Sequence, residues 1–376
     1  MFGDVSPAAA VLRSLGGRKL LFSEDNQAVY ELDELTAFVW QSLRSDMSVA
    51  VIVNELTVAG MGEESAIRAV DEAIAQLPAR RDRRHQQTAA LELEPSNEAI
   101  SLEGLVAVTL EIPNASTVDV RLSADLAPGV RIALGYLQTE SARGDCRIVA
   151  RTVGETIEFY PPDKTMWHCD PADFVATLKA DILEQVLRLA AYEIALHTAA
   201  LIRDGKALLI AGQPGAGKST LALALTQAGW ALAADDVALV NQRGLITGLP
   251  FPLTAKSSSW PLVDRHWPEL AALPTYHRPD GFDVRYIIPE NVASPGPWEV
   301  GAFVLLDRHP NGPVQVEAMD RADMLGTLIS EATSRDQRLT AKGFDALVTS
   351  LEKAQCAKLT YSDLFEGVKA LNELCA

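Results

Sequence analysis

One segment constrains the fold of this 376-residue chain more than any other: a glycine-rich loop lies directly between two apolar runs. The runs are residues 207–211 and 221–225, and the loop reads Gly212-Gln-Pro-Gly-Ala-Gly-Lys-Ser-Thr220. The first run is short and strand-like, and the second belongs to an amphipathic helical pattern over residues 218–227. Strand, loop and helix in this order match the P-loop pattern GxxxxGK[ST], which predicts an α/β domain.

The residue types of the loop suit a triphosphate. Its glycines let the backbone approach phosphate oxygens and point N–H groups at them, and the helix start adds the positive end of its dipole. Lys218 supplies a cation for the β- and γ-phosphates, and Ser219 a hydroxyl ligand for Mg²⁺. We therefore expect ATP or another nucleoside triphosphate to bind with Mg²⁺ at Gly212, Pro214, Gly215, Ala216, Gly217, Lys218, Ser219 and Thr220. The alternative is a strand-to-helix turn that binds no ligand.

Two adjacent acids, Asp235 and Asp236, interrupt an apolar stretch over residues 231–240. Carboxylates inside such a stretch are costly unless they meet a metal, a cation or a hydrogen-bonding substrate. Because side chains alternate along a strand, one acid can face Mg²⁺ while its neighbour turns elsewhere. The alternative is an exposed strand end with two turn formers. His197 ends an apolar helical pattern just before the strand at 207–211, where a packed or capping histidine is the alternative to a catalytic one.

A family resemblance rests on these residues. His197-Thr-Ala-Ala-Leu, the P-loop, and Gly229-Trp-Ala-Leu-Ala-Ala-Asp-Asp-Val-Ala-Leu resemble, in order and spacing, the catalytic core of HPr serine kinase/phosphorylase and its HPr-kinase-related relatives, over roughly residues 195–350. The resemblance implies a phosphotransferase with an alcohol acceptor. It implies that Asp236 takes the proton of a serine or threonine hydroxyl, that Asp235 assists at the metal, and that His197 helps to stabilise the charge of the transferred phosphoryl group.

The chain departs from that family downstream of the acids. The family's Glu-Ile-Arg-Gly stretch is missing, and the corresponding region reads Gly248-Leu-Pro-Phe-Pro-Leu-Thr-Ala-Lys256-Ser-Ser-Ser, which resembles the shorter HPr-kinase-related branch. Reverse phosphorolysis, and HPr itself as the substrate, are therefore left open. Lys256 and Arg285 are candidate phosphate or substrate contacts, and an ordinary surface cation is the alternative for each.

A second resemblance lies at the N-terminus. Strand-like residues 19–22 and 28–32 flank a turn, and three helical patterns follow at 35–43, 49–56 and 67–77. The segments Val29-Tyr-Glu-Leu-Asp-Glu-Leu-Thr-Ala-Phe-Val-Trp-Gln-Ser-Leu43, Ser48-Val-Ala-Val-Ile-Val-Asn-Glu-Leu56 and Ala69-Val-Asp-Glu-Ala-Ile-Ala-Gln-Leu77 resemble PqqD-like domains. Those winged-helix-like domains bind leader peptides of ribosomally made, modified peptides. The resemblance implies that a peptide joins the hairpin edge as an extra strand.

The chain is thus predicted to have four parts: a PqqD-like domain at 1–80, a charged linker at 81–90, a β-rich middle region at 91–170 and a P-loop domain at 171–376. The middle region is predicted to contain strands at 106–112, 118–122, 130–134, 147–153 and 156–160. The last part is predicted to open with a helical pattern over 174–197. Its later elements are predicted to be strands at 207–211, 231–240 and 302–306 and helices at 218–227, 320–330, 344–354 and 361–374.

Composition limits the partners. A net charge of −17 disfavours nucleic acid and anionic membrane surfaces. The four cysteines (Cys146, Cys169, Cys356 and Cys375) lack metal-ligand spacing and are typical of reduced thiols. The chain shows no signal-peptide pattern, and no apolar run approaches the ~20 residues needed to span a bilayer, so we expect a cytoplasmic location. Related HPr kinases are hexameric, and whether this chain forms a homo-oligomer is left open.

Together these patterns predict a kinase that captures a leader peptide and phosphorylates a serine or threonine of the attached peptide or protein. Two alternatives stay open. One is a nucleotide-gated chaperone or scaffold that holds a peptide for another enzyme. The other is a small-molecule kinase, against which stands the lack of an arginine-rich lid pattern.

Overall fold

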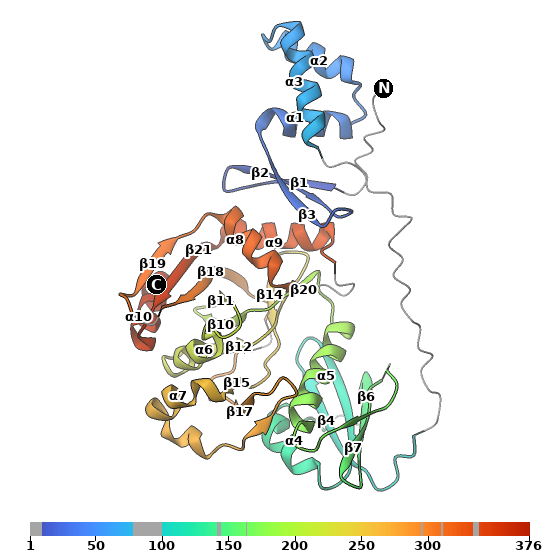
Figure 1. Cartoon of the computed structure of the whole chain (residues 1–376), viewed down its shortest axis with the longest axis vertical. Helices are drawn as coiled ribbons and strands as arrows, with labels where there is room; N and C mark the ends of the chain where they lie inside the picture. Colours follow the sequence, from blue (N-terminus) through green and yellow to red (C-terminus); the bar gives the residue numbers. More distant parts are fainter. Residues whose placement is uncertain are drawn as a thin grey trace.

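The computed structural model describes residues 10–77, 100–140, 144–162, 164–294, 296–309, 311–333 and 338–376. These residues form a mixed α/β structure with five sheets (Figure 1). The predicted linker at 81–90 lies outside the described residues. No helix in the described part of the chain is both long enough and apolar enough to cross a membrane.

A six-stranded sheet forms the centre of residues 171–376, the predicted P-loop domain. Its order is β12 (Ala231–Ala234), β10 (Ala199–Arg203), β11 (Lys206–Ala211), β18 (Glu299–Arg308), β21 (Gln355–Tyr361) and β19 (Gln315–Ala318). β11, β18 and β21 run parallel, and their neighbours pair antiparallel. Parallel strands of this kind are buried on both faces, which explains the continuous apolar run of β11.

Helices cover both faces of this sheet. On β11, Leu208 and Ile210 join one buried cluster together with α6 (Lys218–Gln227) and α10 (Leu364–Leu374). Leu209 and Ala211 join the opposite cluster, which includes α8 (Arg321–Ser330) and α9 (Ala341–Lys353). The residues alternate because successive side chains of a strand point to opposite faces. The helices predicted at 218–227, 320–330 and 344–354 are present, whereas the last helix begins at Leu364 because Tyr361 still belongs to β21.

Two smaller sheets adjoin the central one. The first has the order β14 (Ile246–Gly248), β13 (Ala238–Val240), β9 (Ile194–Leu196) and β20 (Ala332–Thr333), and the second β15 (Leu253–Lys256), β17 (Asp283–Ile287) and β16 (Tyr276–His277). β15 and β17 enclose two short 3-10 helices (Ser257–Ser259 and Pro268–Ala272) and α7 (Trp260–His266). The prediction of one strand over 231–240 is wrong: β12 and β13 lie in different sheets, and the chain turns between them at the two acids.

The middle region is a five-stranded sheet with two helices. Its order is β4 (Val106–Ile112), β5 (Ser116–Leu122), β6 (Cys146–Val153), β7 (Thr156–Tyr160) and β8 (Trp167–Cys169). The strand predicted at 130–134 is wrong, because these residues end α4 (Ala127–Leu134). Val130, Ala133 and Leu134 are all buried, at the three- and four-residue spacing of one helix face.

The helical pattern over 174–197 holds only as far as α5 (Phe174–Leu189). Ile194–Leu196 instead form the fully buried strand β9, because a short apolar run fits a buried strand as well as a helix. Leu178 and Ile182 of α5 pack in one cluster with β4, β5, β6 and β7. The core of the middle region therefore extends past the boundary expected at 170.

The N-terminal module is a three-stranded sheet followed by three helices. Its elements are β1 (Ala10–Leu15), β2 (Arg18–Ser23), β3 (Ala28–Leu32), α1 (Glu34–Arg44), α2 (Val49–Val58) and α3 (Glu63–Gln76). The sequence predicted all of these except β1. Leu21 packs towards α1 with Trp40. Phe22 packs on the other face of the sheet and stacks on Phe344 of α9, with ring centroids 5.1 Å apart.

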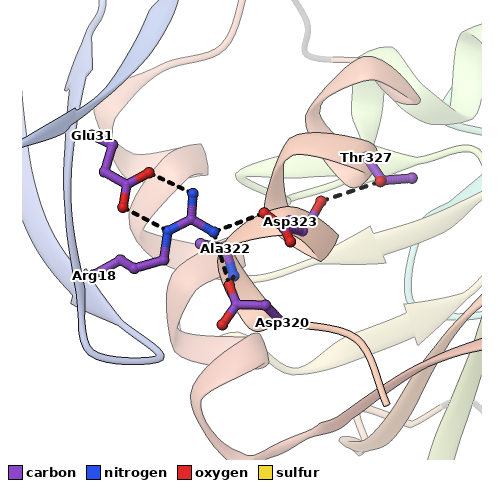
Figure 2. Close-up of polar contacts among 6 residues, drawn as sticks. All are labelled: Arg18, Glu31, Asp320, Ala322, Asp323 and Thr327. Carbon is purple, nitrogen blue, oxygen red and sulfur yellow. Dashed lines mark hydrogen bonds and ion pairs between the residues drawn. The ribbon is translucent and has the colours of Figure 1, made fainter. Parts of the chain in front are cut away.

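An arginine fork also joins this module to the P-loop domain (Figure 2). Arg18 holds Glu31 on β3 and reaches Asp320 and Asp323 at the start of α8, at 3.1 and 2.7 Å. Asp320 at the same time caps α8 by accepting from the Ala322 N–H at 2.8 Å. The β1–β3 sheet therefore sits directly on α8 and α9 (Figure 1).

Candidate active site

The loop after β11 has the local structure that an anion site needs. Gly217 precedes α6 with φ of 99°, a conformation that side chains rarely adopt, and a Cβ there would lie 3.1 Å from the Tyr361 hydroxyl. No side chain caps the N-terminus of α6. The first turn of a helix leaves backbone N–H groups without intrahelical partners, and these favour an anion.

Lys218 extends back along this loop. Its side chain is buried, and Nζ donates to the Gly212 carbonyl at 2.6 Å. Burial lowers the pKa of Lys218, although the carboxylates of Glu331, Asp236 and Asp235 act in the opposite direction. The ammonium therefore lies within electrostatic range of both predicted acids.

Asp235 follows β12 and is 1% exposed, which excludes the alternative of an exposed turn former. Its Oδ2 accepts from the Thr254 N–H at 2.8 Å, whereas Oδ1 has no hydrogen-bond partner. Burial and the neighbouring Asp236 raise its pKa, and the Ser219 side chain lowers it. A buried carboxylate oxygen without a partner is costly, and a bound cation removes that cost.

This donor set fits Mg²⁺ in a P-loop pocket. Mg²⁺ keeps several waters and takes one or two protein oxygens together with phosphate oxygens. The unpartnered Asp235 Oδ1 and the nearby Ser219 hydroxyl are hard oxygen donors of this kind. Within the described ranges, no group of three or more His, Cys, Asp or Glu side chains could hold a metal by itself.

Asp236 is half-buried and faces a lysine that the sequence analysis missed. Lys179 of α5 places Nζ 3.3 Å from Asp236 Oδ2. Burial acts to raise the pKa of Asp236, but Lys179 and His197 lower it below its ordinary value overall. The two adjacent acids therefore differ: Asp236 is held ionised, whereas Asp235 binds a proton more readily.

His197 lies directly after β9, and its backbone N–H donates to the backbone carbonyl of Glu331 at 3.0 Å. Burial and then Lys218 lower the pKa of His197, while Asp236 raises it. These mutual effects show that His197, Lys218 and Asp236 lie within electrostatic range of one another. β13 and β20 hold β9 from both sides, which fixes the backbone that carries the histidine.

Gly248 sets the position of the acid pair. A Cβ on Gly248 would lie 2.2 Å from the Ala233 carbonyl oxygen and 2.5 Å from its carbon, so only glycine lets β14 approach β12 this closely. Ala233 lies two residues before Asp235. The backbone leading into the acid pair is therefore held by a neighbouring strand that tolerates no side chain.

The two predicted phosphate or substrate contacts lie on paired strands, with Ala255 opposite Arg285. Lys256 on β15 places Nζ over the Phe282 ring at 4.9 Å and lies close enough to lower the pKa of Lys218. Arg285 on β17 is 9% exposed, so it is not a surface cation. Its guanidinium pairs with Asp264 at 2.6 Å and stacks over Trp260 at 4.0 Å.

Three residues of the pocket were missed by the sequence analysis: Lys179, Thr254 and Glu331. Lys179 left a signal, because Val175, Lys179, Ile182 and Val186 follow the spacing of one buried helix face. A lysine in an apolar position of this kind needs an acidic partner. Thr254 and Glu331 left no such signal in the sequence. Both act through backbone groups, the Thr254 N–H towards Asp235 and the Glu331 carbonyl towards His197, and these partners are far apart in sequence.

Comparison with solved structures finds similar chains, among them a kinase/phosphatase. The structure is similar to that of the Hpr(Ser) kinase/phosphatase from Coxiella burnetii, with 17% sequence identity and a TM-score of 0.23, over 48% of this chain and 96% of that chain. A TM-score this low carries no information on function. No protein-family model and no curated protein matches the chain. The inference on function therefore depends on the residues of the pocket.

Proposed function

We propose that the chain is an ATP- and Mg²⁺-dependent kinase that phosphorylates a serine or threonine hydroxyl of a peptide or protein. One observation carries this proposal. Asp236 is kept ionised in the same pocket as Lys218 and as the unpartnered Oδ1 of Asp235. Phosphoryl transfer needs cationic charge at the phosphates and one acceptor for the hydroxyl proton, and these residues supply both.

Each residue has a distinct task. The backbone of residues 212–217 and the start of α6 cradle the phosphates, and Lys218 moves from the Gly212 carbonyl to phosphate oxygens. Asp235 and Ser219 would hold Mg²⁺, which screens the charge of the phosphates when bound. Asp236 accepts the proton of the substrate hydroxyl. His197, whose pKa is lowered, donates a hydrogen bond to the phosphoryl group as a neutral imidazole.

The N-terminal module would recruit the substrate. Among the described residues, β3 pairs with β2 alone, so its other edge is open to an added strand. An extended leader peptide can dock there by main-chain hydrogen bonds, with affinity set by backbone pairing and selectivity by side-chain pockets. The net charge of −17 makes nucleic acid an unfavourable partner.

Label transfer tests the proposal. Wild type, Asp236→Asn and Asp204→Asn are incubated with γ-labelled ATP, Mg²⁺ and Ser/Thr peptides preceded by candidate leaders. Asp204 is the matched control, because it is an exposed aspartate in the β10–β11 turn with φ of 51°, which asparagine adopts readily. We expect Asp204→Asn to label peptides like wild type, and Asp236→Asn to lose roughly 10²–10⁴-fold in rate while still binding nucleotide.

Two other results would overturn the proposal. Nucleotide binding without transfer to any peptide would favour the gated scaffold that holds a peptide for another enzyme. Transfer to small alcohols but to no peptide would favour a small-molecule kinase.

A further inference from the structure

Lys179 comes from a part of the chain outside the α/β core of the P-loop domain. Its helix, α5, packs with the middle region through Leu178 and Ile182. The lysine side chain nevertheless leaves that core and enters the pocket beside the P-loop, where it is 8% exposed. The same helix face that buries apolar residues against the middle region therefore delivers one cation to the site.

The contacts of Lys179 hold its ammonium in one place. Nζ lies 3.3 Å from Asp236 Oδ2 and 3.3 Å from Thr254 Oγ1. Two aromatic rings enclose the rest of the group, with Nζ 5.4 Å from the Tyr286 ring centroid and 5.8 Å from that of Phe251. A lysine is flexible when exposed, but one held by a carboxylate, a hydroxyl and two ring faces has little freedom left.

The other cations of the pocket do not replace it. Lys218 donates to the Gly212 carbonyl, and Arg278 pairs with Asp280. In the described part of the chain, Lys179 is the cation that forms an ion pair with Asp236. A buried ion pair is retained only where its geometry and its additional hydrogen bonds compensate for lost hydration, and the Thr254 hydroxyl supplies such a bond.

The middle region is fixed to the walls of this pocket by further contacts. The Tyr136 hydroxyl donates to the Pro250 carbonyl, and the Tyr276 hydroxyl donates to the Gly129 carbonyl at 3.3 Å. The buried cluster of the middle region also includes Phe251 and Tyr286, the two rings that face Lys179. The position of α5 relative to Asp236 is thus set by packing on several sides.

We propose that Lys179 is a positioning residue that orients Asp236, so that the middle region forms a structural part of the active site. The inference rests on the proposed function for what Asp236 does, but the pairing itself does not depend on it. Lys179 acts through Asp236 and touches neither nucleotide nor acceptor. Removing it lets the Asp236 carboxylate turn away from the hydroxyl, which lowers the turnover rate and leaves nucleotide binding in place.

A double-mutant cycle on transfer tests this role. Lys179→Met, Asp236→Asn and the double variant are compared with wild type in kcat for the best-labelled peptide and in affinity for Mg·ATP. Lys164→Met is the matched control. Lys164 is an exposed lysine that forms an ion pair with Glu184, which lies on α5 as Lys179 does. We expect Lys179→Met alone to lose about 100-fold in kcat with Mg·ATP affinity within threefold of wild type. In the Asp236→Asn background the same change should have no further effect, and Lys164→Met should behave like wild type.

A second double-mutant cycle measures the free energy of unfolding in urea without nucleotide. It tests the Lys179–Asp236 ion pair independently of activity. Lys179→Met leaves the half-buried Asp236 carboxylate without its ion-pair partner, so we expect Asp236→Asn to restore stability in that background. Additive effects in either cycle, or a loss of Mg·ATP affinity equal to the loss of kcat, would overturn the inference. If wild type transfers no label, the proposed function fails, and the urea cycle alone decides whether Lys179 holds Asp236.

Discussion

Asp181 carries the sharpest prediction about stability, because it is a buried acid on α5 that takes no part in the proposed chemistry. The residue is 8% exposed, and its Oδ2 has no hydrogen-bond partner. Burial raises its pKa from 3.8 to about 6. In the unfolded chain the carboxyl ionises near its ordinary value, so the folded protein has to bury a charge whenever the pH exceeds both values.

The sign and size of the effect follow from this difference. A raised pKa in the folded state means that the contribution of Asp181 to stability is fully present below about pH 4 and is lost as the pH rises to about 6. The gap of about 2 pH units corresponds to roughly 3 kcal/mol. A replacement amide must itself be buried at this position, which offsets part of the gain. We therefore expect Asp181→Asn to gain on the order of 1–2 kcal/mol at pH 8.

Urea denaturation between pH 4 and pH 8 at constant salt measures this gain. We expect Asp181→Asn to unfold at a higher urea concentration than wild type at pH 8, and the difference to vanish near pH 4. Glu155→Gln is the matched control, since Glu155 is an exposed acid in the β6–β7 turn and its replacement should change little. A gain that is independent of pH, or a loss at pH 8, would refute the reasoning that burial of charge is the cause.

Three further predictions concern contacts that hold the fold together. Phe22→Ala removes the ring stacked on Phe344 and should destabilise the docked N-terminal module by about 3–5 kcal/mol, seen as faster amide exchange in β2 and α9. Arg18→Met should weaken the same docking far less, because its side chain is 34% exposed and water screens its ion pairs; equal effects of the two changes would contradict this. Gly248→Ala drives a Cβ into the Ala233 carbonyl and should cost at least about 3 kcal/mol and abolish transfer, whereas a folded, active variant would show that β14 does not set the acid pair.

The elements that the sequence predicted are those whose pattern lies within one short stretch of residues. The P-loop was predicted because its strand, glycines and helix start are contiguous, and β4, β6 and β7 because each is an apolar run between turns. The strand expected at 130–134 turned out to be the end of α4, whose buried residues repeat at helical spacing over Ala127–Leu134. β9 was read as helix because its burial in a sheet depends on β13 and β20, which lie far along the chain.

In the candidate site, too, the sequence indicated the residues that are close along the chain but not those brought in by tertiary packing. Lys218 and the two acids could be placed together because a P-loop and a pair of acids one helix later share one sheet edge. Lys179 could not, because its approach to Asp236 depends on how α5 packs, a tertiary contact across 57 residues. Which of the two acids lies deeper was also beyond the sequence: the turn after β12 buries Asp235 against the Thr254 N–H and leaves Asp236 towards Lys179.

Nucleotide binding is the step on which the proposed function depends, and a calorimetric titration of ATP tests it most directly. We expect one ATP per chain, bound more tightly with Mg²⁺ than with EDTA, because Asp235 offers an unpartnered oxygen to a cation. Lys218→Met should weaken binding by roughly 10–100-fold, the value of one hydrogen bond to a charged phosphate. Absence of binding by wild type, or equal affinity in Lys218→Met with no dependence on Mg²⁺, would contradict the account and leave residues 212–220 as a turn without a ligand.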